Sequence, residues 1–166
     1  LGQPPAGGAV LVHGGGSGVG TAATSLCREA GLRIVVTAGS PEKCARCLAH
    51  GADVAIDYRA GDFAPAVRDA TGGAGVNVVL DSIGASYLAS NLECLAPGGR
   101  LVLIGLMGGV TSEINLASLM LKRLHVIGST LRARPLDEKA EIVRAFLDRF
   151  GDALRAGRLR PPIDRV

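Results

Sequence analysis

The chain has 166 residues, of which 48% are hydrophobic and 20% charged, and its formal net charge is +3. This composition predicts one globular domain with a sizeable core. The small charge and the aromatic content of 3% argue against a nucleic-acid partner. The apolar runs are short and interrupted, and no signal peptide is visible, so we expect no membrane span and a cytoplasmic location.

The first predicted elements are a strand over Ala9–His13, a glycine-rich turn over Gly14–Gly20 and a helix over Thr21–Ala30. A dinucleotide-binding unit has this order of elements. Its glycines let the backbone approach a pyrophosphate closely, and the helix N-terminus offers N–H groups to the phosphates. The alternative is a tight strand–helix turn that binds no ligand.

Within this turn, the letters GGSGVG fit the pattern G-x-G-x-x-G with a serine at the middle glycine. We therefore expect the turn to contact a cofactor through Gly15, Ser17, Gly18, Val19 and Gly20.

The second predicted strand, Arg33–Thr37, ends at Ala38-Gly39-Ser40, roughly 20 residues beyond the turn. A site specific for NAD usually has Asp or Glu here, to accept a hydrogen bond from the ribose 2′-hydroxyl. This chain has small uncharged residues instead, followed by Lys43 and, less favourably placed, Arg46. Ser40 and Lys43 suit a 2′-phosphate, which favours NADP(H) over NAD(H). Ser40 also fits the cap of the next helix, and the two roles are compatible.

Strands and helices alternate along the rest of the chain. The further strands are expected at Val54–Asp57, Asn77–Asp81, Arg100–Gly105 and His125–Ser129, and the further helices at Pro41–His50, Asp62–Thr71, Ser86–Leu95, Leu116–Arg123 and Asp137–Gly157. This alternation predicts an α/β fold with a doubly wound parallel sheet of about six strands in the order 3-2-1-4-5-6, the Rossmann fold. Thr111–Ile114 is either a short additional strand or a loop crossing the end of the sheet.

Four cysteines are present, and Cys44 and Cys47 form a C-x-x-C pair. The pair lies inside a predicted helix and has no second pair at zinc-site spacing, so we expect no metal. The three histidines, His13, His50 and His125, have no neighbouring partner pattern and are expected to be structural.

Several segments together resemble one family, the zinc-free, zeta-crystallin-like NADPH:quinone oxidoreductase branch of the medium-chain dehydrogenases/reductases. The resemblance covers nearly the whole chain, from about residue 9, and matches the coenzyme-binding domain of that branch. The segments that carry it are SGVG (17–20), VVTAGSPEK (35–43), GADVAIDY (51–58), VNVVLDSIG (76–84), GGRLVLIGLMGG (98–109) and GSTLRAR (128–134).

This resemblance implies a site for NADPH, with Ser40, Lys43 and Tyr58 at the 2′-phosphate. It also implies a nicotinamide side lined through backbone groups by Ile83, Gly105, Leu106 and Met107. The full enzyme would transfer a hydride to a quinone or an α,β-unsaturated carbonyl. The chain itself offers no residue that we can name as catalytic. Members of the branch are usually homodimers with sheets extended across a twofold axis, and we expect the contact near Thr111–Ile114, where β-prone residues follow two glycines.

The resemblance further implies an N-terminal catalytic domain before this segment. We therefore expect residues 1–8 to be a linker, residues 9–166 to be the dinucleotide-binding domain, and 161–166 to begin a strand returning to the catalytic domain. Two alternatives stay open. The chain could be the enoyl-reductase domain of a multi-domain synthase, or a non-catalytic NADPH-binding protein.

Overall fold

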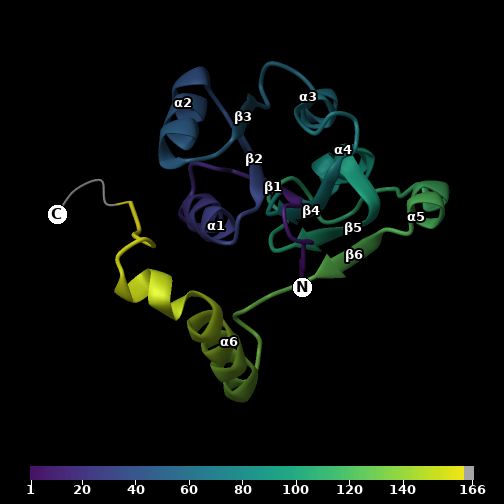
Figure 1. Cartoon of the computed structure of the whole chain (residues 1–166). Helices are drawn as coiled ribbons and strands as arrows, with labels where there is room; N and C mark the ends of the chain where they lie inside the picture. Colours follow the sequence, from purple (N-terminus) through teal and green to yellow (C-terminus); the bar gives the residue numbers. More distant parts are fainter. Residues whose placement is uncertain (163–166) are drawn as a thin grey trace.

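The computed structural model of the chain describes residues 1–162. Within these residues it has a six-stranded parallel sheet in the order β3-β2-β1-β4-β5-β6, with helices on both faces (Figure 1). The order places β1 beside β4, so the direction in which successive strands are added to the sheet reverses between these two parallel neighbours. The predicted doubly wound fold and its strand order are confirmed.

The strands are β1 (Ala9–His13), β2 (Arg33–Ala38), β3 (Val54–Asp57), β4 (Val76–Asp81), β5 (Leu95–Leu103) and β6 (His125–Gly128). The helices are α1 (Gly18–Glu29), α2 (Pro41–His50), α3 (Phe63–Ala70), the short 3₁₀ turn η1 (Ala85–Tyr87), α4 (Leu88–Cys94), α5 (Leu116–Lys122) and α6 (Leu136–Arg155).

The two faces of the sheet carry separate apolar clusters, because alternate residues of each strand point to opposite sides. Leu11 of β1 and Val35 of β2 belong to the cluster that α3 and α4 cover. Val12 and Val36, their neighbours along the chain, belong to the cluster that α1 and α2 cover. Burial on both faces explains the nearly continuous apolar runs in the strands.

Local signals fix the bounds of α2. The Ser40 hydroxyl accepts a hydrogen bond from the Lys43 N–H at 3.2 Å, and Pro41 occupies the first helical position. At the other end Gly51 has φ of +108°, a left-handed conformation that ends the helix. The predicted bounds of this helix are confirmed.

Two elements, α1 and β5, begin several residues earlier than predicted. Helix α1 begins at Gly18 because the Ser17 hydroxyl accepts from the Gly20 N–H at 3.0 Å and caps the helix. Strand β5 begins at Leu95 and includes Pro97–Gly99, and a register shift against β4 accommodates these extra residues.

The possible strand over Thr111–Ile114 does not form, and this segment crosses the end of the sheet as a loop. The place beside β5 is taken by β6, which pairs from Arg100↔His125 to Leu103↔Gly128. Strand β6 is therefore the sheet edge on this side, and Thr111–Ile114 does not supply the strand edge on which the expected dimer contact rested.

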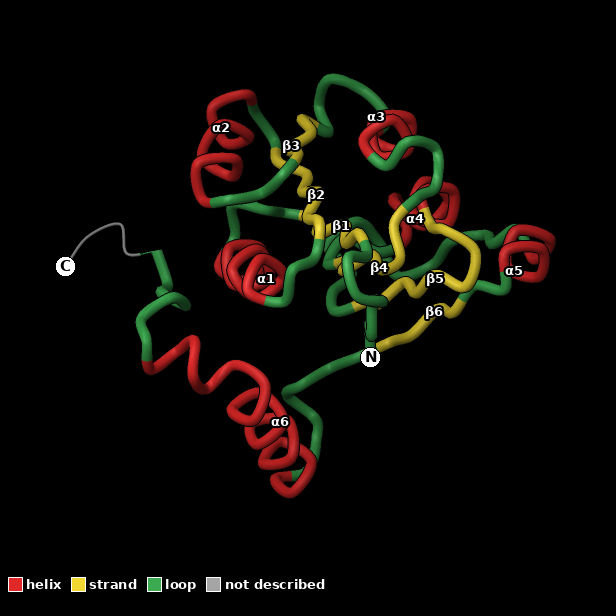
Figure 2. Tube along the Cα trace, viewed as in Figure 1, coloured by secondary structure: helices red, strands yellow, loops and turns green. Residues whose placement is uncertain are grey.

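Helix α6 has the expected length but packs against α1 rather than over the sheet (Figure 2). Arg158, just after the helix, forms an ion pair with Glu29 at the end of α1, with Nη2 and Oε1 2.9 Å apart. Much of its apolar stripe is exposed, including Val143 and Leu147. The expected return strand over 161–166 falls largely outside the described residues and stays a prediction.

Candidate functional site

The loops that carry the expected site residues all follow the carboxyl ends of strands. In a parallel sheet these ends share one edge, so the turns after β1, β2, β3, β4 and β5 are brought together there. Ligands of open α/β sheets bind at this edge, near the point where strand order reverses. The reversal here lies between β1 and β4.

The glycine-rich turn after β1 is packed too closely for side chains at two of its positions. A Cβ atom on Gly15 would lie 2.6 Å from Cβ of Val36, and one on Gly20 would collide with the Gly14 carbonyl oxygen. The Gly15 N–H also donates to the Thr37 carbonyl at 2.9 Å. Gly15 and Gly20 therefore hold the turn against β2 and let it fold back on itself.

The outer part of the same turn is open. Cβ atoms built on Gly16 and Gly18 would meet nothing within 4 Å, and Ser17 and Val19 are exposed. The first N–H groups of a helix have no partner within the helix. Ser17 uses the N–H of Gly20, which leaves those of Gly18 and Val19 at the positive end of α1. This arrangement fits an anion such as a pyrophosphate.

Ser40 and Tyr58 are brought close together at the ends of β2 and β3. The Tyr58 N–H donates to the Ala38 carbonyl at 3.1 Å, and its phenol stands over Gly39. Lys43 is exposed in the first turn of α2, three residues after Ser40. A hydroxyl, a phenol and an ammonium are thus available at this end of the edge, with no carboxylate at positions 38–40.

Ile83 and the loop after β5 form a second unit at the same edge. The Met107 N–H donates to the Ser82 carbonyl at 3.2 Å, the Gly108 N–H to the Ile83 carbonyl at 2.6 Å and the Ala85 N–H to the Gly109 carbonyl at 3.1 Å. These bonds place Ile83 beside Gly105, Leu106 and Met107, whose backbone lies at the surface of this edge.

Four buried polar side chains beneath these loops were not expected from the sequence. Asp81 is fully buried at the end of β4 and accepts hydrogen bonds from the Ile83 and Gly84 N–H groups. His13 contacts Thr37 and Asn91, so it has polar partners distant in the sequence. A polar residue at the end of an apolar strand is a weak signal for Asp81, and no local signal points to Asn91.

The C-x-x-C pair faces the core. Cys44 and Cys47 are buried in the cluster between α2 and the sheet, and burial raises the pKa of both thiols. All four cysteines are free, and no group of three or more His, Cys, Asp or Glu residues able to hold a metal ion occurs among residues 1–162. The described residues therefore do not fit a zinc centre.

Also within residues 1–162, no helix combines the length and apolar character that crossing a bilayer requires.

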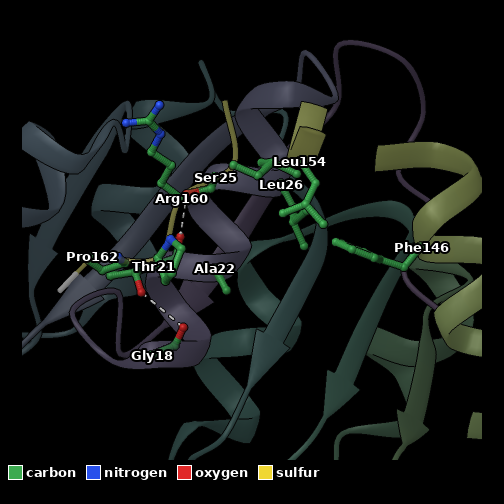
Figure 3. A pocket seen from close by; sticks show the side chains of 11 residues that line it. Gly18, Thr21, Ala22, Ser25, Leu26, Phe146, Leu154, Arg160 and Pro162 are labelled. Carbon is green, nitrogen blue, oxygen red and sulfur yellow. Dashed lines mark hydrogen bonds between the residues drawn. The ribbon is translucent and has the colours of Figure 1, made fainter. Parts of the chain in front are cut away.

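A pocket of about 300 Å³ extends along α1 from Gly18, at the loop edge, between this helix and residues of α6 and of the segment 159–162 that follows it (Figure 3). Its walls are mostly apolar, with Ala22 and Leu26 of α1 facing Phe146 and Leu154 of α6. Gly18 is the one expected site residue that lines this pocket.

A family model for zinc-binding dehydrogenases matches residues 18–148, from the start of α1 into α6. The chain belongs to this family. It is the coenzyme-binding domain of a medium-chain dehydrogenase/reductase of the quinone oxidoreductase branch, as the resemblance predicted.

Three relatives of this dehydrogenase domain illustrate the match. It is 31% identical to rat quinone oxidoreductase (Rattus norvegicus) over 152 residues, which cover 92% of this chain and 43% of the relative. Escherichia coli quinone oxidoreductase complexed with NADPH superimposes with a TM-score of 0.81 at 26% identity, covering 97% of this chain and 49% of that one. A putative enoyl reductase domain of polyketide synthase gives a TM-score of 0.78 at 31% identity, and the match covers 98% of this chain and 89% of that domain. The chain spans less than half the length of the rat relative.

Proposed function

We propose that this dehydrogenase domain binds NADPH at the carboxyl edge of its sheet, as part of an enzyme that reduces quinones or α,β-unsaturated carbonyls. The observation that carries the proposal is the convergence of the open glycine turn, the Ser40–Tyr58 corner and the Ile83–Met107 unit on one edge. Each suits a different part of a dinucleotide. The pyrophosphate would take the N–H groups of Gly18 and Val19.

The preference for NADPH over NADH rests on charge and shape at the end of β2. Residues 38–40 present no carboxylate to repel a 2′-phosphate or to accept from a ribose hydroxyl. Ser40 and Tyr58 can donate to phosphate oxygens, and Lys43 supplies a positive charge. Ser40 keeps its capping bond to Lys43, since a hydroxyl can accept one hydrogen bond and donate another.

The protein's contribution to the reaction is positioning. NADPH, when bound, supplies a hydride from C4 of its nicotinamide to the electron-poor carbon or oxygen of the acceptor. Backbone groups of Ile83 and of the loop at Gly105, Leu106 and Met107 would hold the nicotinamide ring at the open end of the edge. Fixing the reactive carbon in this way reduces the entropy cost of the transfer. The acceptor class is supported by the names of the relatives.

Calorimetric titration of the chain with NADPH and with NADH tests the proposal. Charge-assisted bonds to the 2′-phosphate are worth roughly 1.5–3 kcal/mol each, so NADPH should bind about tenfold more tightly or better. Equal affinities or a preference for NADH would overturn the NADPH assignment. The reduction of a quinone is measured on the protein that contains this chain, and binding without turnover there would favour a non-catalytic NADPH-binding protein.

A second candidate is the enoyl-reductase domain of a multi-domain synthase. It is favoured by the similarity to the putative polyketide synthase domain, most of which this chain covers. A parent protein that reduces an enoyl thioester in preference to a quinone would decide for this candidate.

We also propose a homodimer formed through β6. This strand is a sheet edge with unpaired backbone groups on its outer side, and Val126 on the strand and Leu121 just before it are exposed apolar residues. A cytoplasmic location is supported by four free cysteines, which persist in reducing compartments.

A further inference from the structure

A continuous chain of buried hydrogen bonds runs beneath the loop edge, through one residue each of β2, β1, α4 and β4. Thr37 Oγ1 lies 3.0 Å from His13 Nδ1, and His13 Nε2 lies 2.7 Å from Asn91 Oδ1. Asn91 Nδ2 donates to Asp81 Oδ2 at 3.0 Å. All four side chains are nearly or completely buried. Within residues 1–162, no buried side-chain nitrogen or oxygen lacks a partner.

The direction of every bond in this chain follows from Asp81. A carboxylate can only accept, so the Asn91 amide must present its NH₂ to Asp81 and its oxygen to His13. His13 must therefore carry its proton on Nε2. Burial lowers the pKa of His13 and keeps the ring neutral at pH 7. Nδ1 of the ring then accepts from the Thr37 hydroxyl.

The chain of buried hydrogen bonds ends at backbone groups of two different loops. At one end the Gly14 N–H donates to Thr37 Oγ1 at 3.4 Å, and the Gly15 N–H donates to the Thr37 carbonyl at 2.9 Å. At the other end, Asp81 accepts from the Ile83 N–H at 2.6 Å and from the Gly84 N–H at 3.1 Å. One loop is proposed to bind the pyrophosphate and the other to line the nicotinamide side.

Two aromatic rings pack around His13, in the middle of this chain of hydrogen bonds. The His13 ring makes edge contacts with Phe63 and Tyr87, each with ring centroids 4.8 Å away. Phe63 begins α3 and Tyr87 lies directly before α4. These rings surround the imidazole with apolar groups, so water does not compete for its hydrogen bonds.

We propose that Thr37, His13, Asn91 and Asp81 are positioning residues that fix the Gly14–Gly20 turn relative to the Ser82–Gly84 loop. The proposal rests on the proposed NADPH site. These hydrogen bonds affect the binding of a ligand that spans both loops, and not of one that reaches the Gly14–Gly20 turn but not the Ser82–Gly84 loop. None of the four side chains is assigned a contact with the cofactor.

The decisive comparison uses two ligands and two variants. NADPH spans the whole edge, whereas 2′,5′-ADP lacks the nicotinamide half. Asn91→Leu removes the central amide at similar volume, and Thr37→Val removes the terminal hydroxyl. Each variant should lower the affinity for NADPH by about tenfold or more and the affinity for 2′,5′-ADP by less than about threefold. Leu92→Ala, a buried neighbour of Asn91 outside the chain, is the matched control and should not change the ratio of the two affinities.

A second measurement needs no variant. The ¹⁵N chemical shifts of His13 in the native protein should show the proton on Nε2 at pH 7, in the presence or absence of ligand. A proton on Nδ1 would overturn the hydrogen-bond chain. An unchanged NADPH to 2′,5′-ADP ratio in folded Asn91→Leu and Thr37→Val, or an equal change in Leu92→Ala, would overturn the positioning role alone. If the unaltered protein bound neither ligand, the proposed function would fail as well, and the two failures are therefore distinguishable.

Discussion

The hydroxyl oxygen of Tyr58 lies 2.7 Å from the position that a Cβ atom on Gly39 would occupy. This close approach couples the end of β2 to the residue after β3, and no side chain fits between them. The small residue at position 39 therefore has two consequences. It keeps the end of β2 free of a side chain next to Ser40, and it lets the phenol reach this corner of the proposed site.

Gly39→Ala should lower the affinity for NADPH but not the affinity for NADH. The added methyl group displaces the half-exposed Tyr58 ring toward solvent, which removes a hydrogen bond from the 2′-phosphate but disturbs the fold little. We expect a loss of about tenfold for NADPH and little change for NADH, measured by calorimetry. In a Tyr58→Leu background the same substitution should have no additional effect on NADPH. Full additivity of the two changes would show that Gly39 does not act through Tyr58.

Lys43→Ala should also lower the affinity for NADPH more than the affinity for NADH. Lys43 is exposed and is assigned to the 2′-phosphate alone, so its loss should weaken NADPH by about tenfold and leave NADH within about twofold. Arg46→Ala, which removes the next exposed cation of α2, serves as the control and should have the smaller effect. Equal losses for NADPH and NADH in Lys43→Ala would mean that this residue acts through the fold.

Gly20→Ala tests the packing of the glycine turn. Helix propensity alone would make this change stabilising by about 1 kcal/mol, because Gly20 lies in the first turn of α1. The Cβ atom would collide with the backbone of Gly14 and Gly15, so we expect a net loss of about 2–3 kcal/mol in the free energy of unfolding. Gly16→Ala, where the space is open, should change it by less than about 0.5 kcal/mol. Urea denaturation measures both, and stabilisation by Gly20→Ala would contradict the observed packing.

The sequence predicted those elements whose signals are local. Helix α2 has a serine cap, a proline at its first position and a glycine after its end, and its bounds matched. The strand order followed from apolar runs and from the general preference of such folds. The loop edge could likewise be predicted, because every glycine-rich turn considered follows a strand.

Features that depend on distant residues could not be predicted in this way. Asn91 and His13 are 78 positions apart, and their bond exists because α4 packs over the end of β1. Thr111–Ile114 has β-prone residues, but β6 already occupies the place beside β5. The apolar stripe of α6 predicted a helix correctly, yet its spacing could not tell that the helix would pack against α1 and not the sheet, with much of the stripe exposed.

The buried His13 ring should make folding stability depend on pH. Burial lowers its pKa in the folded protein, while the hydrogen bond to Asn91 and the charge of Asp81 raise it by less. The unfolded chain, with a histidine pKa near about 6.5, therefore takes up the proton first. The free energy of unfolding should be highest above about pH 6.5 and should fall as the pH is lowered toward about 5. Urea denaturation over this range measures it.

The pH dependence should belong to His13 and not to an exposed histidine. His13→Gln should flatten the curve between about pH 5 and 6.5, whatever its effect on absolute stability. His125→Gln, at an exposed position on β6, should leave the shape of the curve unchanged. A pH dependence in His13→Gln as steep as that of the unaltered protein would contradict the assignment.

The proposed dimer can be tested by proline at the sheet edge. The Ser129 N–H donates to the Leu103 carbonyl, so the N–H two residues earlier, on Ile127, also faces β5, and that of Val126 faces the open side. Val126→Pro therefore removes a donor from the open edge without breaking the pairing with β5. Light scattering should find a dimer for the unaltered chain and a monomer for Val126→Pro. Thr111→Pro, in the loop where no strand forms, should remain a dimer. A monomeric unaltered chain, a persistent Val126→Pro dimer, or dissociation by Thr111→Pro would each show that β6 is not the interface.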